Sequence, residues 1–431
     1  MEQKCTVRLQ LKARYLPFVV GLLLLLQLLV PYRGWMILLV GMGGAWLLSH
    51  RWARSLARGL ELTREMRYGW AQVGDRLQER FTLANRGWAP ATWVAILDQS
   101  DLPGYNTSAV KGVGERAVIH WFEEGVCNRR GLYTLGPTSL QTGDPFGFYA
   151  VTLEYPTSVT MMVMPPVVHL PSLDVAPAGR AGEGRHRTRA LEQDLSVASV
   201  REYAPGDSLR LIHWPTTARR DEPFVRTFDS TPSSDWWIFL DMDRRVQAGE
   251  GQTSTEEHGV ILAASLAERG LQSGKAVGLA AQGADLAWLP PRLGADQRWQ
   301  ILRALALVEP GQRSLTTLLA RARPSVKGRS GLVIITPNLG GAWLEAMAFL
   351  MRRGVVPTVL LLDAAAFGGE GDAGHVVATL EAMDVSYYLI TPDLLDRPEI
   401  RPGRIGHWRQ TDRGRWEPKF NPRELAWRSL T

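Results

Sequence analysis

Two long apolar runs open the chain, and a short turn separates them. Residues 15–30 are broken only by Gln27, Pro31–Gly34 is a turn sequence, and residues 35–49 are apolar again. Each run is shorter than the roughly twenty residues that cross a bilayer, but flanking arginine side chains can extend it to the interface. We therefore predict a transmembrane helical hairpin with basic flanks over residues 1–59, or a shallow hairpin within one leaflet. The predicted membrane residues are Leu16, Val30, Trp35 and Ser49.

Basic residues around these runs set the expected orientation. Arg33 is the only basic residue in the turn, whereas both outer flanks are rich in lysine and arginine. The flanking residues are Lys4, Arg8, Lys12 and Arg14 before the first run, and Arg51, Arg54, Arg58 and Arg64 after the second. The positive-inside rule places both ends in the cytoplasm, so we predict a multi-pass cell-membrane protein with cytoplasmic soluble domains. The two cysteines, Cys5 and Cys127, suggest neither a disulfide framework nor a zinc site.

Residues 60–165 alternate short runs rich in Val, Thr, Trp and Tyr with turns of Gly, Asn and Pro. One example is Arg76–Ala84, which a polar Asn-Arg-Gly turn follows. Regular short strands with turn signals are typical of antiparallel sheets, so we predict an immunoglobulin-like β-sandwich here. Two motifs, Arg129–Pro137 and Asp144–Phe148, have the composition of tight turns next to strands. We interpret both as structural rather than catalytic.

Residues 166–234 form a predicted connector that ends in a dense motif. Its first part, Pro171–Gln193, is poor in bulky apolar residues and predicts an exposed loop. Its second part combines a Pro-Gly turn, a carboxylate and several arginines, the set that forms a carboxylate–guanidinium network. The predicted network residues are Arg201, Tyr203, Gly206, Asp207, Arg210, Trp214 and Arg219. Structural ion pairing and partner recognition are both open for this network, and we interpret His213 within it as a packed or surface histidine.

The stretch Asp235–Asp243 organises the rest of the chain. Its four bulky residues, 237–240, stand without polar alternation between acidic ends, which is typical of a strand buried on both faces of a parallel sheet. Two carboxylates follow at the strand's carboxyl end, where open α/β sheets bind ligands. Downstream, apolar strands alternate with helices and one hairpin, so we predict a doubly wound α/β domain over residues 235–392. The tail, 393–431, is rich in Arg, Pro and Trp and is predicted to wrap or fray.

Several of these motifs together resemble one bacterial family. The block Arg201–Trp214 has the pattern Arg-x-Tyr-x-x-Gly-Asp-x-x-Arg-x-Ile-x-Trp, and the two upstream motifs contain Arg-Gly-x-Tyr-x-Leu-Gly-Pro and Asp-Pro-Phe-Gly. The chain is similar to the domain-of-unknown-function family 58 from the apolar runs to about residue 391. The resemblance implies a von Willebrand factor A-like C-terminal domain and gene neighbourhoods with MoxR-type AAA+ ATPases and transglutaminase-like proteins. It implies no established reaction.

The resemblance also implies a metal site after the first strand of that domain. Its ligands would be Asp-x-Ser-x-Ser, a threonine from a later loop and an Asp after the fourth strand, the hard oxygen ligands that magnesium needs. Asp241 matches the first position, but Asp243 and Arg245 replace the two serines, and the Thr-Pro-Asn sequence at 336–338 offers no Asp. We predict Asp241 and Asp243 as ligands of a degenerate site, with magnesium as the candidate cation. Alternatively, Arg245 fills the site through an internal ion pair.

Composition narrows the function classes. The formal net charge is +6, but much of the excess lies near the apolar N-terminus and no nucleic-acid-binding motif is present, so we predict no nucleic-acid partner. The leading hypothesis is a non-enzymatic, membrane-anchored cytoplasmic scaffold whose protein partner, by resemblance, is a MoxR-type AAA+ ATPase. The second is a metal-dependent adhesion-type receptor using Asp241 and Asp243. The third is a hydrolase using Asp207, His213 and Asp241, which no nucleophile elbow, P-loop or paired-histidine motif supports.

Overall fold

Two compact units make up the chain. The computed structural model describes residues 5–66, 69–170, 173, 175, 197–202, 214–220, 222–228, 235–326, 330–396, 408–410, 416–418 and 428–429. The unit called here the β-rich unit comprises residues 1–168, 305–307 and 398–431, and the α/β unit comprises residues 169–304 and 308–397.

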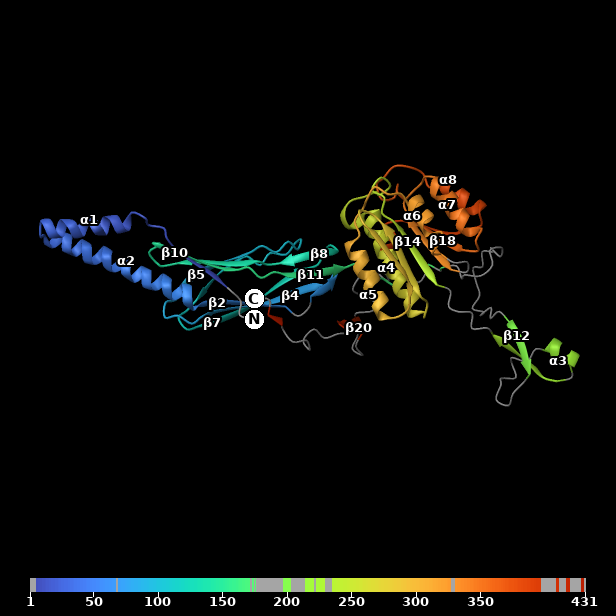
Figure 1. Ribbon diagram of the computed structural model, residues 1–431, viewed down its shortest axis with the longest axis horizontal. Helices are drawn as coiled ribbons and strands as arrows, with labels where there is room; N and C mark the ends of the chain where they lie inside the picture. Colours follow the sequence, from blue (N-terminus) through green and yellow to red (C-terminus); the bar gives the residue numbers. More distant parts are fainter. Residues whose placement is uncertain are drawn as a thin grey trace. The chain divides into compact units, whose positions relative to one another are not determined.

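The two apolar runs form the helices α1 (Leu16–Leu29) and α2 (Arg33–Gly59), which lie side by side (Figure 1). At 1.5 Å per residue the 14 residues of α1 span only about 21 Å. Helix α2 is longer, but three glycines lower the hydropathy of its apolar run, and that run ends at His50 and Arg51 although the helix continues. Among the described residues, no helix is both long and apolar enough to cross a membrane. The predicted transmembrane hairpin is therefore wrong, and so is the multi-pass membrane localisation that rested on it.

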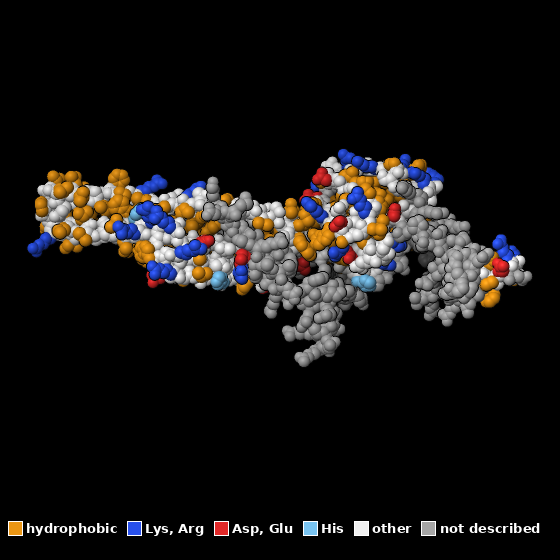
Figure 2. Space-filling view, turned by 60° about the horizontal axis from the view of Figure 1, so that its bottom comes forward, with side chains coloured by type: hydrophobic (Ala, Val, Ile, Leu, Met, Phe, Trp, Pro, Cys, Tyr) orange, Lys and Arg blue, Asp and Glu red, His pale blue; other side chains and the backbone are white. Residues whose placement is uncertain are grey.

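The residues predicted to contact a membrane occupy mixed positions on this helix pair. Leu16 and Ser49 are buried, Trp35 is half-buried, and Val30 is exposed just after α1. Figure 2 shows apolar side chains over the visible face of the pair. The end of α2 instead joins the core of the β-rich unit through buried residues such as Leu56. The apolar pattern thus predicted two helices correctly, but not what surrounds them.

Three sheets of three or more strands build most of the β-rich unit. In spatial order, the first contains β1 (Thr6–Leu11), β10 (Tyr149–Tyr155), β9 (Thr138–Gly143), β5 (Ala91–Asp98) and β6 (Ala109–Val113). The second contains β22 (Arg428–Ser429), β2 (Leu60–Met66), β4 (Arg76–Asn85) and β7 (Val118–Val126), and the third contains β3 (Trp70–Gln72), β11 (Val159–Met164) and β8 (Gly131–Leu135). Two short pairings extend our predictions: the predicted basic flank contains β1, which pairs with β10, and the tail contributes β22, which pairs with β2.

The first two sheets share one hydrophobic core. Strand β4 buries every second side chain, as a strand with one face in a core must. Phe81 and Leu83 from β4 pack with Ile96, Leu140 and Val151 from the other sheet. The short antiparallel strands predicted for this region are therefore present, and they enclose a shared core.

The Asp144–Phe148 motif is a tight turn, as predicted. The carboxylate of Asp144 accepts hydrogen bonds from the backbone N–H groups of Phe146 (3.0 Å) and Tyr149 (2.6 Å). Gly147 has φ of +72°, a left-handed conformation that glycine adopts without a Cβ clash. The rings of Phe146 and Phe148 stack at 5.8 Å between centroids. All of these interactions organise the turn itself, which fits the structural interpretation.

One six-stranded sheet forms the centre of the α/β unit. Its spatial order is β16 (Leu286–Arg292), β15 (Val277–Gln282), β14 (Trp236–Asp241), β17 (Gly331–Thr336), β18 (Val356–Leu362) and β19 (Ser386–Ile390). Only β16 is antiparallel to its neighbour within this sheet. The prediction of a central buried strand at 237–240 is confirmed, because all six residues of β14 are buried between two parallel neighbours.

Helices cover both faces of this sheet (Figure 1). They are α4 (Thr255–Gln272), α5 (Ala295–Leu307), α6 (Leu315–Ala322), α7 (Ala342–Met351) and α8 (Gly374–Ala382), with the short η2 (Gly251–Thr253) before α4 and α9 (Asp393–Asp396) after β19. Gly259 of α4 lies against Leu240, since a Cβ there would be 3.0 Å from its Cδ1. Trp237 and Phe239 point to the opposite face, where they share a core with Trp343 of α7.

The predicted connector contains a small strand pair. Strands β12 (Val197–Glu202) and β13 (Phe224–Phe228) are antiparallel, and α3 (Trp214–Arg220) lies between them in sequence. In the tail, β20 (Trp408–Gln410) pairs with β21 (Trp416–Pro418). The signature block therefore begins on a strand and ends on a helix.

Candidate functional site

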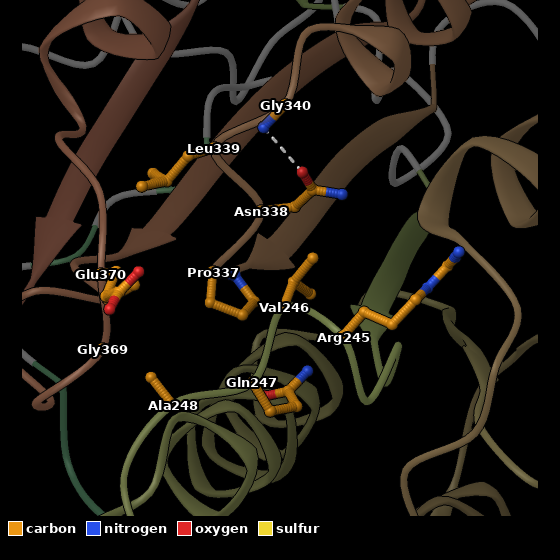
Figure 3. Close-up of a pocket in the computed structure, with 11 residues that line it drawn as sticks. Arg245, Val246, Gln247, Ala248, Pro337, Asn338, Leu339, Gly340, Gly369 and Glu370 are labelled. Atoms are coloured by element: carbon orange, nitrogen blue, oxygen red, sulfur yellow. Dashed lines mark hydrogen bonds between the residues drawn. The ribbon is translucent and has the colours of Figure 1, made fainter.

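A pocket lies where the order of strands reverses. The chain moves from β14 to β15 on one side, and later returns to place β17 on the other side. Open α/β sheets bind ligands beyond the carboxyl ends of the two strands at such a switch point. A pocket of about 350 Å³ is found there, and Figure 3 shows its lining residues. They come from the loops after β14, β17 and β18: Arg245, Val246, Gln247, Ala248, Pro337, Asn338, Leu339, Gly340, Ala364, Gly369 and Glu370.

The loop after β14 is held by a second loop that crosses it. The backbone N–H of Gly311 donates to the carbonyl of Met242 (2.8 Å), and that of Arg244 donates to the carbonyl of Gly311 (2.7 Å). The crossing loop also packs tightly on the turn after β15, where glycine is required: a Cβ at Gly283 would lie 1.8 Å from the carbonyl oxygen of Glu309, and a Cβ at Gly311 would lie 2.0 Å from that of Gly283. The backbone that presents the acidic residues is therefore fixed on the side away from the pocket loops of β17.

Asp241 ends β14 and is 3% exposed. The Thr336 hydroxyl donates to its Oδ2 (2.7 Å), and the backbone N–H of Asp243 donates to its Oδ1 (3.1 Å). Burial raises the pKa of Asp241 to about 6, and the Thr336 bond opposes that rise only in part. This carboxylate is thus a buried, satisfied group rather than an open ligand.

Asp243 forms a bidentate ion pair with Arg245. The guanidinium donates through Nε to Oδ1 (2.9 Å) and through Nη2 to Oδ2 (2.7 Å). The carboxylate is 2% exposed, whereas the arginine side chain is 66% exposed. These hydrogen bonds lower the pKa of Asp243 below its ordinary range. The internal ion pair that we considered as an alternative to a metal is present.

Gln247 and Asn338 support the site, and our sequence reasoning missed both as functional residues. Gln247 donates through Nε2 to the Asp241 carbonyl (3.0 Å) and accepts from the Thr255 hydroxyl (2.8 Å). The side-chain Oδ1 of Asn338 accepts from the Gly340 N–H (2.7 Å), the bond drawn in Figure 3. The only available signal for Asn338 was its position two residues after a buried strand. Gln247 gave no signal, since its partners come from the fold.

The donor set, as arranged here, does not fit magnesium. Both oxygens of Asp243 are bound by Arg245, and both oxygens of Asp241 accept protein hydrogen bonds. An octahedral magnesium site needs free oxygen ligands, and the Arg245 charge would repel the cation. Within the described part of the chain, no group of three or more Asp, Glu, His or Cys side chains could hold a metal ion.

The signature block is described only at its ends. Tyr203, Gly206, Asp207, Arg210 and His213 lie outside the described residues, so the predicted network and the hydrolase hypothesis stay predictions. The remaining block members are Arg201 on β12 and, on α3, Trp214 and Arg219, both of which are exposed. Neither Trp214 nor Arg219 is among the described residues that line the pocket.

Residues 199–366 match the model of one family. Its description is "Protein of unknown function DUF58". The DUF58 match contains β14, β17 and the residues Asp241, Asp243 and Arg245. It covers less than half of the chain, so it assigns the region of the site rather than the whole protein.

Two relatives of the chain are named as uncharacterized proteins. Uncharacterized protein YeaD of Bacillus subtilis is 26% identical over 294 residues, which cover 65% of this chain and 71% of that protein. Uncharacterized protein Mb1516 of Mycobacterium bovis is 28% identical over 169 residues, 38% of this chain and 53% of that protein. The chain thus spans about half the length of this mycobacterial relative.

One solved structure with partial similarity is that of an aerotolerance-related membrane protein from Bacteroides fragilis with multiple mutations to serines. It is 21% identical to this chain, and the alignment covers 30% of this chain and 67% of that one, with a TM-score of 0.24. At that score the likeness supports no conclusion about fold. The von Willebrand A-like character implied by the DUF58 resemblance stays a prediction.

Asp241 is expected to make the stability of the full chain depend on pH. Its folded-state pKa lies above the unfolded value, so the folded state binds the extra proton. Stability from this group is therefore complete below about pH 4 and is lost as the pH rises through about 6, by about 2–3 kcal/mol in total. Hydrogen exchange of β14 amides, compared between wild type and Asp241→Asn from pH 5 to 8, measures the difference. Equal slopes in both proteins would contradict the expectation.

Proposed function

We propose that the α/β unit is a docking module that binds a segment of another protein in the pocket beyond β14 and β17. The position of this pocket at the switch point of the sheet is the observation that carries the proposal. None of the described residues lining it is Ser, Thr, Cys, Lys, His or Tyr, and its one carboxylate is that of Glu370. Its lining combines aliphatic and amide side chains with the charged side chains of Arg245 and Glu370, a mixture that supports binding of a segment with both apolar and polar groups.

The partner that we propose is a MoxR-type AAA+ ATPase. This choice rests on the family resemblance of the signature block and of the two upstream motifs, which the DUF58 match at residues 199–366 supports in part. The von Willebrand A-like character implied by the same resemblance supports a role in protein recognition. A scaffold that needs no catalytic group is consistent with the internally satisfied Asp241 and Asp243.

Filling the pocket with a larger side chain is expected to weaken binding of the ATPase. Val246 is half-buried on the pocket wall, and a Trp in its place would occupy the space that the partner segment needs. We expect Val246→Trp to weaken binding of a purified MoxR-type ATPase to the full chain by about tenfold or more, or about 1.4 kcal/mol. Biolayer interferometry measures the dissociation constant.

The matched control is Leu293→Trp, which adds the same side chain at an exposed position away from the pocket lining. It should leave the dissociation constant within about twofold of wild type. An ATPase that never binds the wild type would refute this partner. Binding that Val246→Trp leaves intact would refute the pocket as its site.

A further inference from the structure

Arg245 uses only one edge of its guanidinium group inside the protein. Nε and Nη2 donate to the two oxygens of Asp243, which is the side-on geometry of a bidentate pair. A guanidinium has five N–H donors, and its other bidentate edge is formed by Nη1 and the second hydrogen of Nη2. No described residue accepts a hydrogen bond from Nη1, and the side chain is 66% exposed. The end-on edge therefore faces solvent.

The position of this arginine is dictated by charge. Asp241 is the last residue of one buried strand, and Asp243 stands two residues later. Two like charges this close make it unfavourable for both carboxylates to be ionised. A nearby cation offsets the repulsion between the two carboxylates, and a divalent metal ion is one cation that can do so. Here the cation is a side chain of the same loop, held to a carboxylate that is 2% exposed. An ion pair with one buried partner and two hydrogen bonds is held more firmly than an ordinary exposed pair.

We infer that Arg245 is a built-in cation in the place of a divalent metal at the carboxyl end of β14. We also infer that the end-on edge of its guanidinium binds a carboxylate group of the docking partner. The second half of the inference rests on the proposed docking function; the first half does not. An Asp or Glu side chain, or a C-terminal carboxylate, matches the planar two-donor edge of a guanidinium.

The geometry places this contact at the rim of the pocket. Figure 3 shows the Arg245 side chain running away from the other lining residues, while Gly369 and Glu370 lie on the far side of the pocket. A partner segment bound in the pocket would therefore place its acidic group at the pocket rim, next to Arg245, and not on the pocket floor. Recognition of this kind needs no divalent ion, so chelation by EDTA should leave it unchanged.

The first half is tested with the full chain and manganese alone. We expect about 1 mM MnCl2 to leave the thermal unfolding midpoint of the wild type unchanged, and to raise that of Arg245→Ser by about 3 °C or more. Adding Asp243→Asn to Arg245→Ser should remove the gain. Arg245→Gln, which keeps much of the side chain, is a second variant in case the serine variant does not fold.

Two results would overturn the built-in cation. One is a manganese shift in the wild type that Asp243→Asn abolishes, because the site would then already accept a metal. The other is the absence of any shift in both folded Arg245 variants, because removing the arginine would then uncover no cation position. Neither readout involves the ATPase, so this arm stands or falls independently of the proposed function.

The second half is tested with a fluorescein-labelled hexaglutamate peptide in EDTA. We expect Arg245→Gln to weaken binding by about tenfold or more. The matched control is Arg244→Gln, since Arg244 is an exposed arginine in the same loop whose guanidinium donates to the carbonyl of Pro310. It should change affinity by less than about twofold.

Equal losses in the two variants would show general attraction to positive charge and would overturn specific recognition by Arg245. A wild-type chain that does not bind the peptide would overturn the carboxylate half, whatever the manganese result. If the peptide behaves as expected but the ATPase does not bind, the proposed partner fails while the inference on Arg245 stands.

Discussion

Replacing Arg64 with alanine is expected to destabilise the β-rich unit by about 3–5 kcal/mol. Arg64 lies on β2 between the two packed sheets and is 2% exposed. Its guanidinium donates to Glu79 Oε2 through Nε (3.0 Å) and Nη2 (2.8 Å), and to Asp98 Oδ1 through Nη1 (2.8 Å). Both carboxylates are almost fully buried, and the Tyr105 hydroxyl also donates to Glu79.

The large effect follows from what the substitution leaves behind. Burial raises the pKa of Glu79, and the Arg64 charge opposes that rise. Without Arg64, Glu79 and Asp98 would be two buried carboxylates with no counter-charge, so one must take up a proton or the strands must separate. The cost is therefore mainly that of unpaired buried charge, not of lost contacts.

Hydrogen exchange of the β4 backbone amides in the full chain measures this change where it arises. The matched control is Arg86→Ala, since Arg86 pairs with Glu61 at the surface, with side chains 77% and 49% exposed. The control should cost no more than about 1 kcal/mol. Equal losses for the two arginines would show that the buried network contributes nothing special to stability.

Replacing Phe239 with alanine is expected to destabilise the α/β unit by about 3–5 kcal/mol. Phe239 is the middle of β14 and is fully buried. Its ring centroid lies 5.9 Å from that of Trp237 and 6.3 Å from that of Trp288. Truncation removes buried apolar surface and leaves a cavity. The surrounding side chains, which the sheet and its covering helices hold in place, cannot move in to close it.

The effect should reach the pocket, because β14 carries Asp241 at its end. Exchange of the β14 and β17 amides in the full chain is the measurement. Leu293→Ala, at a position 60% exposed, is the control and should change stability by less than about 0.5 kcal/mol. A loss below about 1 kcal/mol for Phe239→Ala would contradict the view that this strand is the centre of the core.

Local patterns predicted the strands and helices of the α/β unit because each one is encoded within a few residues. The unbroken bulky run at 237–240 indicates a strand buried on both faces, and the helices that follow have apolar residues at helical spacing. The ion pair between Asp243 and Arg245 was also within reach, since its partners are two residues apart. Such predictions need no knowledge of distant segments.

Predictions failed where partners are far apart in sequence. The predicted basic flank contains β1, whose partner β10 begins at residue 149, and no pattern within Thr6–Leu11 identifies that partner. The neighbouring apolar runs misled us about the membrane, because we expected flanking arginine side chains to extend two short runs, whereas no described helix is long and apolar enough to cross. Arg64 was assigned to the flank of a membrane segment, whereas the fold buries it.

The sequence by itself determined where residues 235–392 form helices and strands, and which two carboxylates stand at the end of the central strand. Only the tertiary structure decided which of its charges are buried, that Arg64 meets Glu79 and Asp98, and that the loops at 245–248, 337–340 and 364–370 share one pocket. The physical reason is range. Backbone preference and amphipathic spacing act between near neighbours, whereas burial and charge pairing depend on segments that only folding brings together.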